Sequence, residues 1–99
     1  MRVKIKDLRP HMEDLEVVAR VVNKSQATEI RMKKYAYATI EDETGKIKLN
    51  LWRDQVEQVD VGDLIKVTNA FVHTRTGEKQ LSTWSDIGKG SLREFVHSS

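Results

Sequence analysis

Short runs of alternating apolar and polar residues make up most of the chain, and polar turn sequences separate them. Residues 15–22 (LEVVARVV) are rich in β-branched side chains, which favour extended structure, and they predict a first strand. Similar patterns predict four further strands at residues 35–41, 46–52, 64–73 and 79–84. The chain is therefore expected to be mostly β.

The segments between these strands contain turn and helix signals. Gly45 and Gly77 end two candidate hairpin turns, because glycine readily adopts a positive φ. Val56 and Val59 have helical spacing, which predicts one short helix over residues 53–59. Residues 25–34 are polar and are expected to form a long, basic loop.

Five short strands with a helix between the third and the fourth is the order of an OB-fold, a five-stranded Greek-key barrel. Other small barrels share parts of this order. The length of 99 residues predicts a single domain over residues 1–99. Residues 1–14 are expected to form a lead-in with one helical turn that Pro10 ends. Residues 88–99 are expected to form a tail that packs on the barrel.

The turn at Asp42-Glu43-Thr44-Gly45 predicts how the second and third strands pair. If Asp42 lies opposite Gly45, the turn fixes which residues of the two strands are partners, and each pair of partners lies on one face of the sheet. One face then consists only of apolar side chains and should belong to the core. Its members are Ile40 with Ile47, Ala38 with Leu49, and Ala36 with Leu51.

The opposite face is expected to point outward, although it contains three aromatic residues. Tyr35 lies opposite Trp52, Tyr37 opposite Asn50, and Thr39 opposite Lys48. Exposed rings beside cationic side chains are typical of proteins that bind single-stranded nucleic acid, because bases stack on the rings. Duplex DNA does not offer its base faces in this way. The alternative is structural, with Trp52 tucked under the following helix and Tyr35 covering a core edge.

The position of the charges is more informative than their sum. The formal net charge is only +2, although 32% of the residues are charged. Lys33 and Lys34, with Arg31, lie in the basic loop that overhangs the binding face of an OB-fold. We expect these residues to contact phosphates, and the alternative is a loop that is merely solvated. Arg53 follows Trp52 and is expected to join the same basic track.

Several other classes of protein are disfavoured. The absence of cysteine excludes disulfides and thiolate zinc sites and is typical of a reducing, intracellular setting. No apolar run approaches about 18 residues, and the basic start is not followed by an apolar segment, so we expect no membrane span and no signal peptide. His11, His73 and His97 lack metal-ligand spacing and are expected to be surface or loop residues. Triad and P-loop motifs are absent, so we expect neither an enzyme nor a cofactor.

Three segments resemble one known family. Residues 42–52 (DETGKIKLNLW) match the D-x-T-G-x-[IV]-x-[LI]-x-[LV]-W stretch of archaeal single-stranded DNA-binding proteins and replication protein A domains. Residues 61–71 (VGDLIKVTNAF) resemble their next segment, and residues 5–10 followed by Met12 resemble their opening. The resemblance implies an OB-fold and non-enzymatic binding of unpaired DNA, in a cytoplasmic protein associated with the nucleoid.

The resemblance also implies roles for single residues. Trp52 and Phe71 match stacking aromatics of the family, and Arg20 and Lys48 match basic positions. Phe71 has the same parity as the inward-facing Ile65 and Val67, so it points outward only if a bulge occurs near Asn69-Ala70.

Two positions depart from the family pattern. Arg75 stands where close relatives often have another aromatic, and its guanidinium can stack on a base or pair with a phosphate. Trp84 lies where relatives vary, and it either replaces the missing ring or caps the barrel.

These observations lead to the hypothesis of a sequence-tolerant binder of single-stranded DNA that acts in replication, recombination or repair, with or without protein partners from those processes. Two alternatives remain open. One is an RNA- or tRNA-binding OB module, and the other is a protein-interaction OB domain within a larger replication protein A complex.

Overall fold

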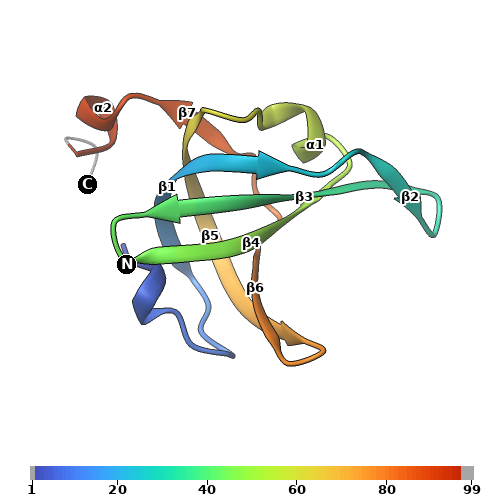
Figure 1. Ribbon diagram of the computed structural model, residues 1–99, viewed down its shortest axis with the longest axis horizontal. Coiled ribbons are helices and arrows are strands. Elements are labelled where there is room, and N and C mark those ends of the chain that lie inside the picture. The colour runs from blue at the N-terminus through green and yellow to red at the C-terminus, as the bar shows by residue number, and fades with distance from the viewer. Residues whose placement is uncertain (1, 97–99) are drawn as a thin grey trace.

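Five strands close into a ring in the computed structural model, which describes residues 2–96 of the chain (Figure 1). The ring order is β1-β3-β4-β6-β5, and β5 pairs with β1 to close it. β4 and β6 pair in parallel, and the other ring pairings are antiparallel. The strands are β1 (Leu15–Lys24), β3 (Lys33–Asp42), β4 (Gly45–Trp52), β5 (Leu64–Arg75) and β6 (Glu78–Ser82). The helix α1 (Gln55–Gln58) lies between β4 and β5, which confirms the predicted OB-fold.

Two short strands are added to this ring. β2 (Thr28–Ile30) lies within the segment predicted to be a loop, and it pairs with the start of β3. Arg31 and Met32 form the turn of this hairpin with φ values of 52° and 68°, the left-handed conformation that suits a two-residue hairpin turn. The loop prediction was wrong there because a three-residue strand is too short to show alternation. In Figure 1 this hairpin extends beyond the ring.

Both ends of the described chain contact the ring. The short helix η1 (Ile5–Asp7) buries Ile5, and Leu8 after it is fully buried. At the other end, β7 (Gly88–Gly90) pairs with β5, and α2 (Leu92–Val96) places Phe95 in a buried position. Residues 97–99 of the predicted tail, including His97, lie outside the described residues. Within residues 2–96, no helix is long and apolar enough to cross a membrane.

The β3–β4 register is the one that the turn predicts. Asp42 pairs with Gly45, and Tyr35 pairs with Trp52 at the other end of the hairpin. The side chain of Asp42 fixes the turn, because Oδ1 accepts a hydrogen bond from the Thr44 amide (2.7 Å) and Oδ2 accepts one from the Ile5 amide (2.9 Å). The six apolar residues predicted to face the core are all buried.

A β-bulge reverses the sidedness of β5 at its midpoint. Leu15 of β1 pairs with Ala70 of β5, and Val17 pairs with Val67, so two residues of β1 lie opposite three of β5. Asn69 takes up the extra residue with φ of 52°. Ile65 and Val67 are buried before the bulge, and Ala70 and Val72 are buried after it. The bulge that the sequence requires for an outward Phe71 is therefore present.

Asn69→Ala is expected to be less stable than Asn69→Gly by about 1 kcal/mol, because only glycine adopts a positive φ without a steric cost. Both variants lose the hydrogen bond from Asn69 Nδ2 to Ser85 Oγ (2.9 Å), so their difference isolates the backbone. Chemical denaturation measures the two free energies of unfolding. Equal stabilities, or a more stable alanine variant, would contradict a left-handed residue at this position.

Candidate nucleic-acid interface

Four strands contribute side chains to one surface on the side of the sheet opposite the core, here called the outward face. Its continuity follows from the pairing of Lys48 with Gln80, of Gln80 with His73, and of Ser82 with Phe71. The face consists of Tyr35 and Tyr37 from β3, Lys48, Asn50 and Trp52 from β4, Glu78, Gln80 and Ser82 from β6, and Phe71, His73 and Arg75 from β5.

A buried polar layer forms the floor of the outward face. Asn50, Gln80 and Ser82 are each no more than 5% exposed, so Asn50 points outward as predicted but is covered by its neighbours. Asn50 Nδ2 donates to Gln80 Oε1 (2.9 Å) and Ser82 Oγ (3.3 Å). The Tyr35 hydroxyl donates to Asn50 Oδ1 (2.5 Å). Because each buried polar side-chain atom of this floor has a hydrogen-bond partner, the floor is internally satisfied and holds Tyr35 in place.

Trp52 packs against Tyr35 at the end of the β3–β4 hairpin. The two ring centroids are 4.6 Å apart with the planes inclined at 50°. Trp52 is half-buried, and its backbone amide donates to Gln55 Oε1 (3.0 Å). Gln55 Nε2 in turn donates to the carbonyls of Thr83 and Ser85. Trp52 is therefore fixed at its backbone and supported on one side by a ring, while part of its indole remains accessible.

Phe71 and Trp84 form a second aromatic pair. Their ring centroids are 5.8 Å apart, and Phe71 also lies 5.9 Å from the ring of His73. Trp84 is 80% exposed, so it does not cap the barrel, and this alternative for Trp84 is wrong. Thr83 Oγ1 donates to the carbonyl of Thr68 (2.6 Å), which ties the residue before Trp84 to the bulge that turns Phe71 outward.

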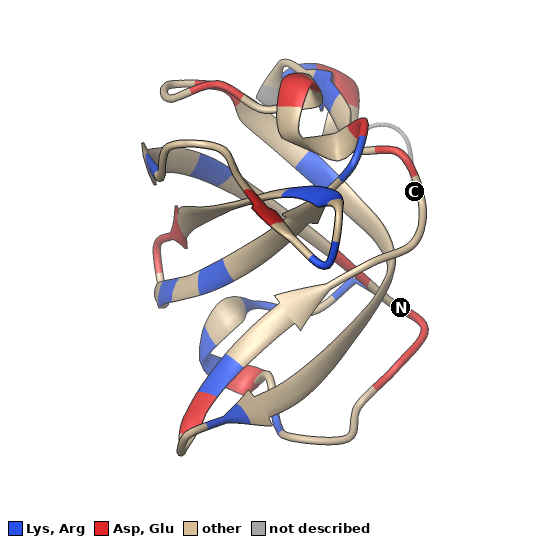
Figure 2. Ribbon diagram, turned by 90° about the vertical axis from the view of Figure 1, so that its right-hand side faces the viewer, with Lys and Arg blue, Asp and Glu red and all other residues tan. Residues whose placement is uncertain are grey.

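One groove brings both tryptophans together with cations. Its volume is about 710 Å³. Its lining residues are Ile30, Arg31, Lys33, Trp52, Arg53, Asp54, Gln55, Arg75, Trp84 and Asp86. The β2–β3 hairpin, which points toward the viewer in Figure 2, supplies Ile30, Arg31 and Lys33. None of the four cationic residues in this lining is in an ion pair with any residue between 2 and 96.

Arg53, which the sequence predicts to join the basic track, is one of the residues that line the groove. Arg53 is exposed with φ of 57°, and its amide donates to the carbonyl of Lys34 (2.8 Å). Arg53 and Lys33 both belong to the groove lining.

Three predicted basic residues lie elsewhere or are already engaged. Lys34 forms an ion pair with Glu57 of α1 and lines a smaller hollow that shares Lys33, Arg53 and Asp54 with the groove. Lys48 Nζ lies 4.4 Å from the centroid of the Tyr37 ring and 3.3 Å from Glu78 Oε1.

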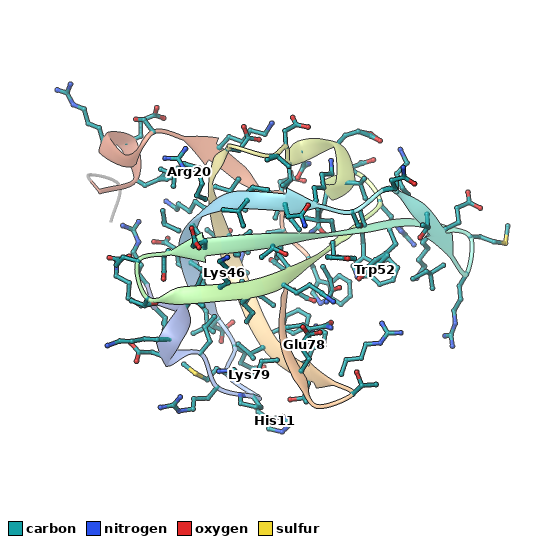
Figure 3. All side chains as sticks on the ribbon, in the orientation of Figure 1. His11, Arg20, Lys46, Trp52, Glu78 and Lys79 are labelled. Carbon is teal, nitrogen blue, oxygen red and sulfur yellow. The ribbon has the colours of Figure 1, made fainter. Side chains whose placement is uncertain are left out.

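Arg20 lies apart from the groove. It pairs with Glu41, six residues along β3 from Tyr35, which is about 20 Å at the rise of a strand. Its Nη1 donates to the carbonyl of Gly62 (3.0 Å). Figure 3 labels Arg20 and Trp52 well apart along the sheet.

His73 is the residue that sequence reasoning missed. It lies in β5 rather than in a loop and is half-buried on the outward face, where Nε2 lies 2.8 Å from Ser82 Oγ. The sequence does contain a signal for His73, because it lies two residues after Phe71 and therefore shares the face to which the bulge turns Phe71. Burial, and secondarily the charge of Arg75, lowers the pKa of His73. His11 is exposed, and residues 2–96 contain no cluster of histidine and carboxylate side chains suited to a metal ion.

Comparisons with known proteins agree with the fold. The tRNA anti-codon family model, an "OB-fold nucleic acid binding domain", matches residues 15–84. The chain is 34% identical over 105 residues to the "Single-stranded DNA binding protein Ssb" of Saccharolobus solfataricus, with 100% of this chain and 71% of that protein covered. A domain of replication protein A from Methanococcus maripaludis superposes with a TM-score of 0.78 at 26% identity, with 90% and 94% of the two chains covered.

A further match is to part of an enzyme. The chain is 35% identical over 75 residues to a lysine–tRNA ligase of Dechloromonas aromatica. The match covers 68% of this chain but only 15% of the ligase, so the likeness extends over a small part of that enzyme.

The free energy of unfolding is expected to fall as the pH drops below 6.5, the ordinary pKa of histidine. Because the pKa of His73 is lower in the folded chain, the unfolded chain takes up this proton first, and the stabilisation present above pH 6.5 is lost on acidification. His73→Gln should remove this part of the pH dependence. The carboxylates with lowered pKa values titrate below pH 4.5, so their contribution lies in a separate, lower pH range. Denaturant unfolding at a series of pH values measures it, and His11→Gln is the matched control. A parental slope in both variants would show that burial of His73 does not contribute.

Proposed function

This chain belongs to the family of OB-fold nucleic acid binding domains, and from that premise we propose that it binds single-stranded DNA with little sequence preference. The observation that carries the proposal is the groove in which Trp52 and Trp84 lie among four cations without ion-pair partners in the described chain. Such a protein acts where DNA is transiently unpaired, in replication, recombination or repair, and we propose that it works at the nucleoid in the cytoplasm.

Base stacking supplies the sequence tolerance. Every base has a π-face, so Trp52 and the Phe71–Trp84 pair accept any of them at about 1–3 kcal/mol per base. Tyr35 supports Trp52 from one side, and Tyr37 offers a further ring on the same face. The rings need bases that are not stacked in a duplex, which favours an unpaired strand as the ligand.

The cations supply the electrostatic contribution. Arg31, Lys33, Arg53 and Arg75 are free to meet phosphates, because binding a phosphate breaks no ion pair among the described residues. Each phosphate contact releases condensed counterions, so log K should fall with log salt concentration by roughly 0.7 per contact on a single strand. Lys34 and Lys48 contribute less in this proposal, because each already contacts a carboxylate.

RNA is the second candidate ligand, and one observation favours it. The matched family carries the tRNA anticodon name, and one relative is a tRNA ligase. Oligonucleotides of matched sequence in DNA and RNA form separate the two candidates, because only RNA offers the 2′-hydroxyl. The polar floor is internally satisfied, so it presents few groups that would recognise a hydroxyl, and we place DNA first. We propose no catalytic step for either ligand.

Trp52→Ala and Trp84→Ala are each expected to weaken binding of an oligo-dT strand by about 1–3 kcal/mol, because each removes one stacking surface. Fluorescence anisotropy of a labelled oligonucleotide measures the affinities, and circular dichroism checks that the barrel persists. Val61→Ala, an exposed apolar side chain in the turn before β5, is the control and should bind like the parent. Parental affinity in both tryptophan variants would refute stacking in this groove, and a parent that binds a replication protein but no oligonucleotide would favour a protein-interaction domain.

Arg75→Gln is expected to reduce the slope of log K against log salt by roughly 0.7, because one phosphate contact is lost. Arg93→Gln makes the same change of charge on α2, away from the groove lining, and should leave the slope unchanged. Titrations at several salt concentrations measure both slopes. An equal reduction in the two variants would mean that net charge, rather than a contact in the groove, determines the salt dependence.

A further inference from the structure

Glu78 places a carboxylate on the outward face, at the start of β6 (Figure 3). Its Oε1 lies 3.3 Å from Lys48 Nζ and accepts a hydrogen bond from Gln80 Nε2 (3.1 Å). Both contacts favour the ionised form and hold the pKa of Glu78 below its ordinary value of 4.5, so the group is negative at neutral pH. An anion held in this way is unexpected on a surface that binds a polyanion.

Lys48 links this carboxylate to the stacking surface. Its ammonium lies 4.4 Å from the centroid of the Tyr37 ring, on the same face as Glu78. A nucleic-acid strand that crosses the outward face at Tyr37 would bring a phosphate toward the same ammonium. The carboxylate of Glu78, 3.3 Å from this ammonium, already serves as its anionic partner.

We propose that Glu78 competes with the DNA backbone for Lys48 and so limits both the affinity of this surface and its salt dependence. This inference rests on the proposed function. While Lys48 stays paired with Glu78 it neutralises no phosphate, so no counterion is released from the bound strand at this position. Glu78 also repels the approaching phosphates, and both effects favour release of the strand.

The test compares the parent with Glu78→Gln, which removes the charge and keeps the shape of the side chain. The Lys48–Glu78 pair is partly exposed, with side-chain exposures of 28% and 53%, and exposed pairs of this kind are weak. We therefore expect oligo-dT to bind about 2- to 5-fold more tightly near 0.1 M salt. The slope of log K against log salt should become steeper by roughly 0.7, because Lys48 becomes an additional phosphate contact.

Two further variants separate competition from a general effect of charge. Glu43→Gln breaks the exposed Lys4–Glu43 pair (2.8 Å), at the turn before β4 and away from the groove lining, and should change neither affinity nor slope. In a Lys48→Gln background, Glu78→Gln should no longer steepen the slope, because the group for which it competes is gone. Thermal unfolding of each variant checks that the fold is intact.

The outcomes distinguish this inference from the proposed function. A parent that binds no single strand overturns the proposed function and this inference with it. If the parent binds while Glu78→Gln leaves the affinity and slope unchanged, the inference alone is overturned. Weaker binding by Glu78→Gln also overturns it and means that Glu78 instead orients Lys48 for the nucleic-acid strand. A steeper slope that persists without Lys48 also overturns it.

Discussion

The tight turn between β3 and β4 fixes the register on which the outward face depends. With Asp42 opposite Gly45, alternation places Ala36, Ala38 and Ile40 in the core and their neighbours on the other side. A shift of one residue would bury the tyrosines and expose the core. The carboxylate of Asp42 holds this turn and also the amide of Ile5, so the same side chain fixes the hairpin and one end of the barrel.

The bulge at Asn69 has the corresponding role in β5. It reverses the sidedness of the strand, so Ile65 and Phe71, which have the same parity, face opposite sides of the sheet. This one residue brings the Phe71–Trp84 pair onto the side that already carries Trp52. Two local backbone conformations, a turn and a bulge, thereby combine rings from distant parts of the chain into one surface.

Much of this arrangement follows from the sequence, because alternation and turn residues act over short distances. The five ring strands and the β3–β4 register were predictable in this way, whereas the bulge in β5 was expected only from the family resemblance at Phe71. The hairpin at β2, the burial of His73 and the positions of Lys34 and Arg20 were not, because they depend on which strands become neighbours. Trp84 shows the same limit. Its position in the sequence left two roles equally open, replacement of the missing ring and capping of the barrel, and only the folded structure shows that its side chain is exposed.

The closed ring of β-strands has a consequence if, as proposed, many copies of the protein bind along one length of single-stranded DNA. Neighbouring copies would be held side by side at very high local concentration, a condition under which a long, free strand edge invites unwanted sheet extension between molecules. Pairing of β1 with β5 removes the long edges of the ring, and the added strands β2 and β7 are only three residues each. The fold thus combines the outward face, on which we propose that nucleic acid binds, with a backbone that offers few free strand edges to its own copies.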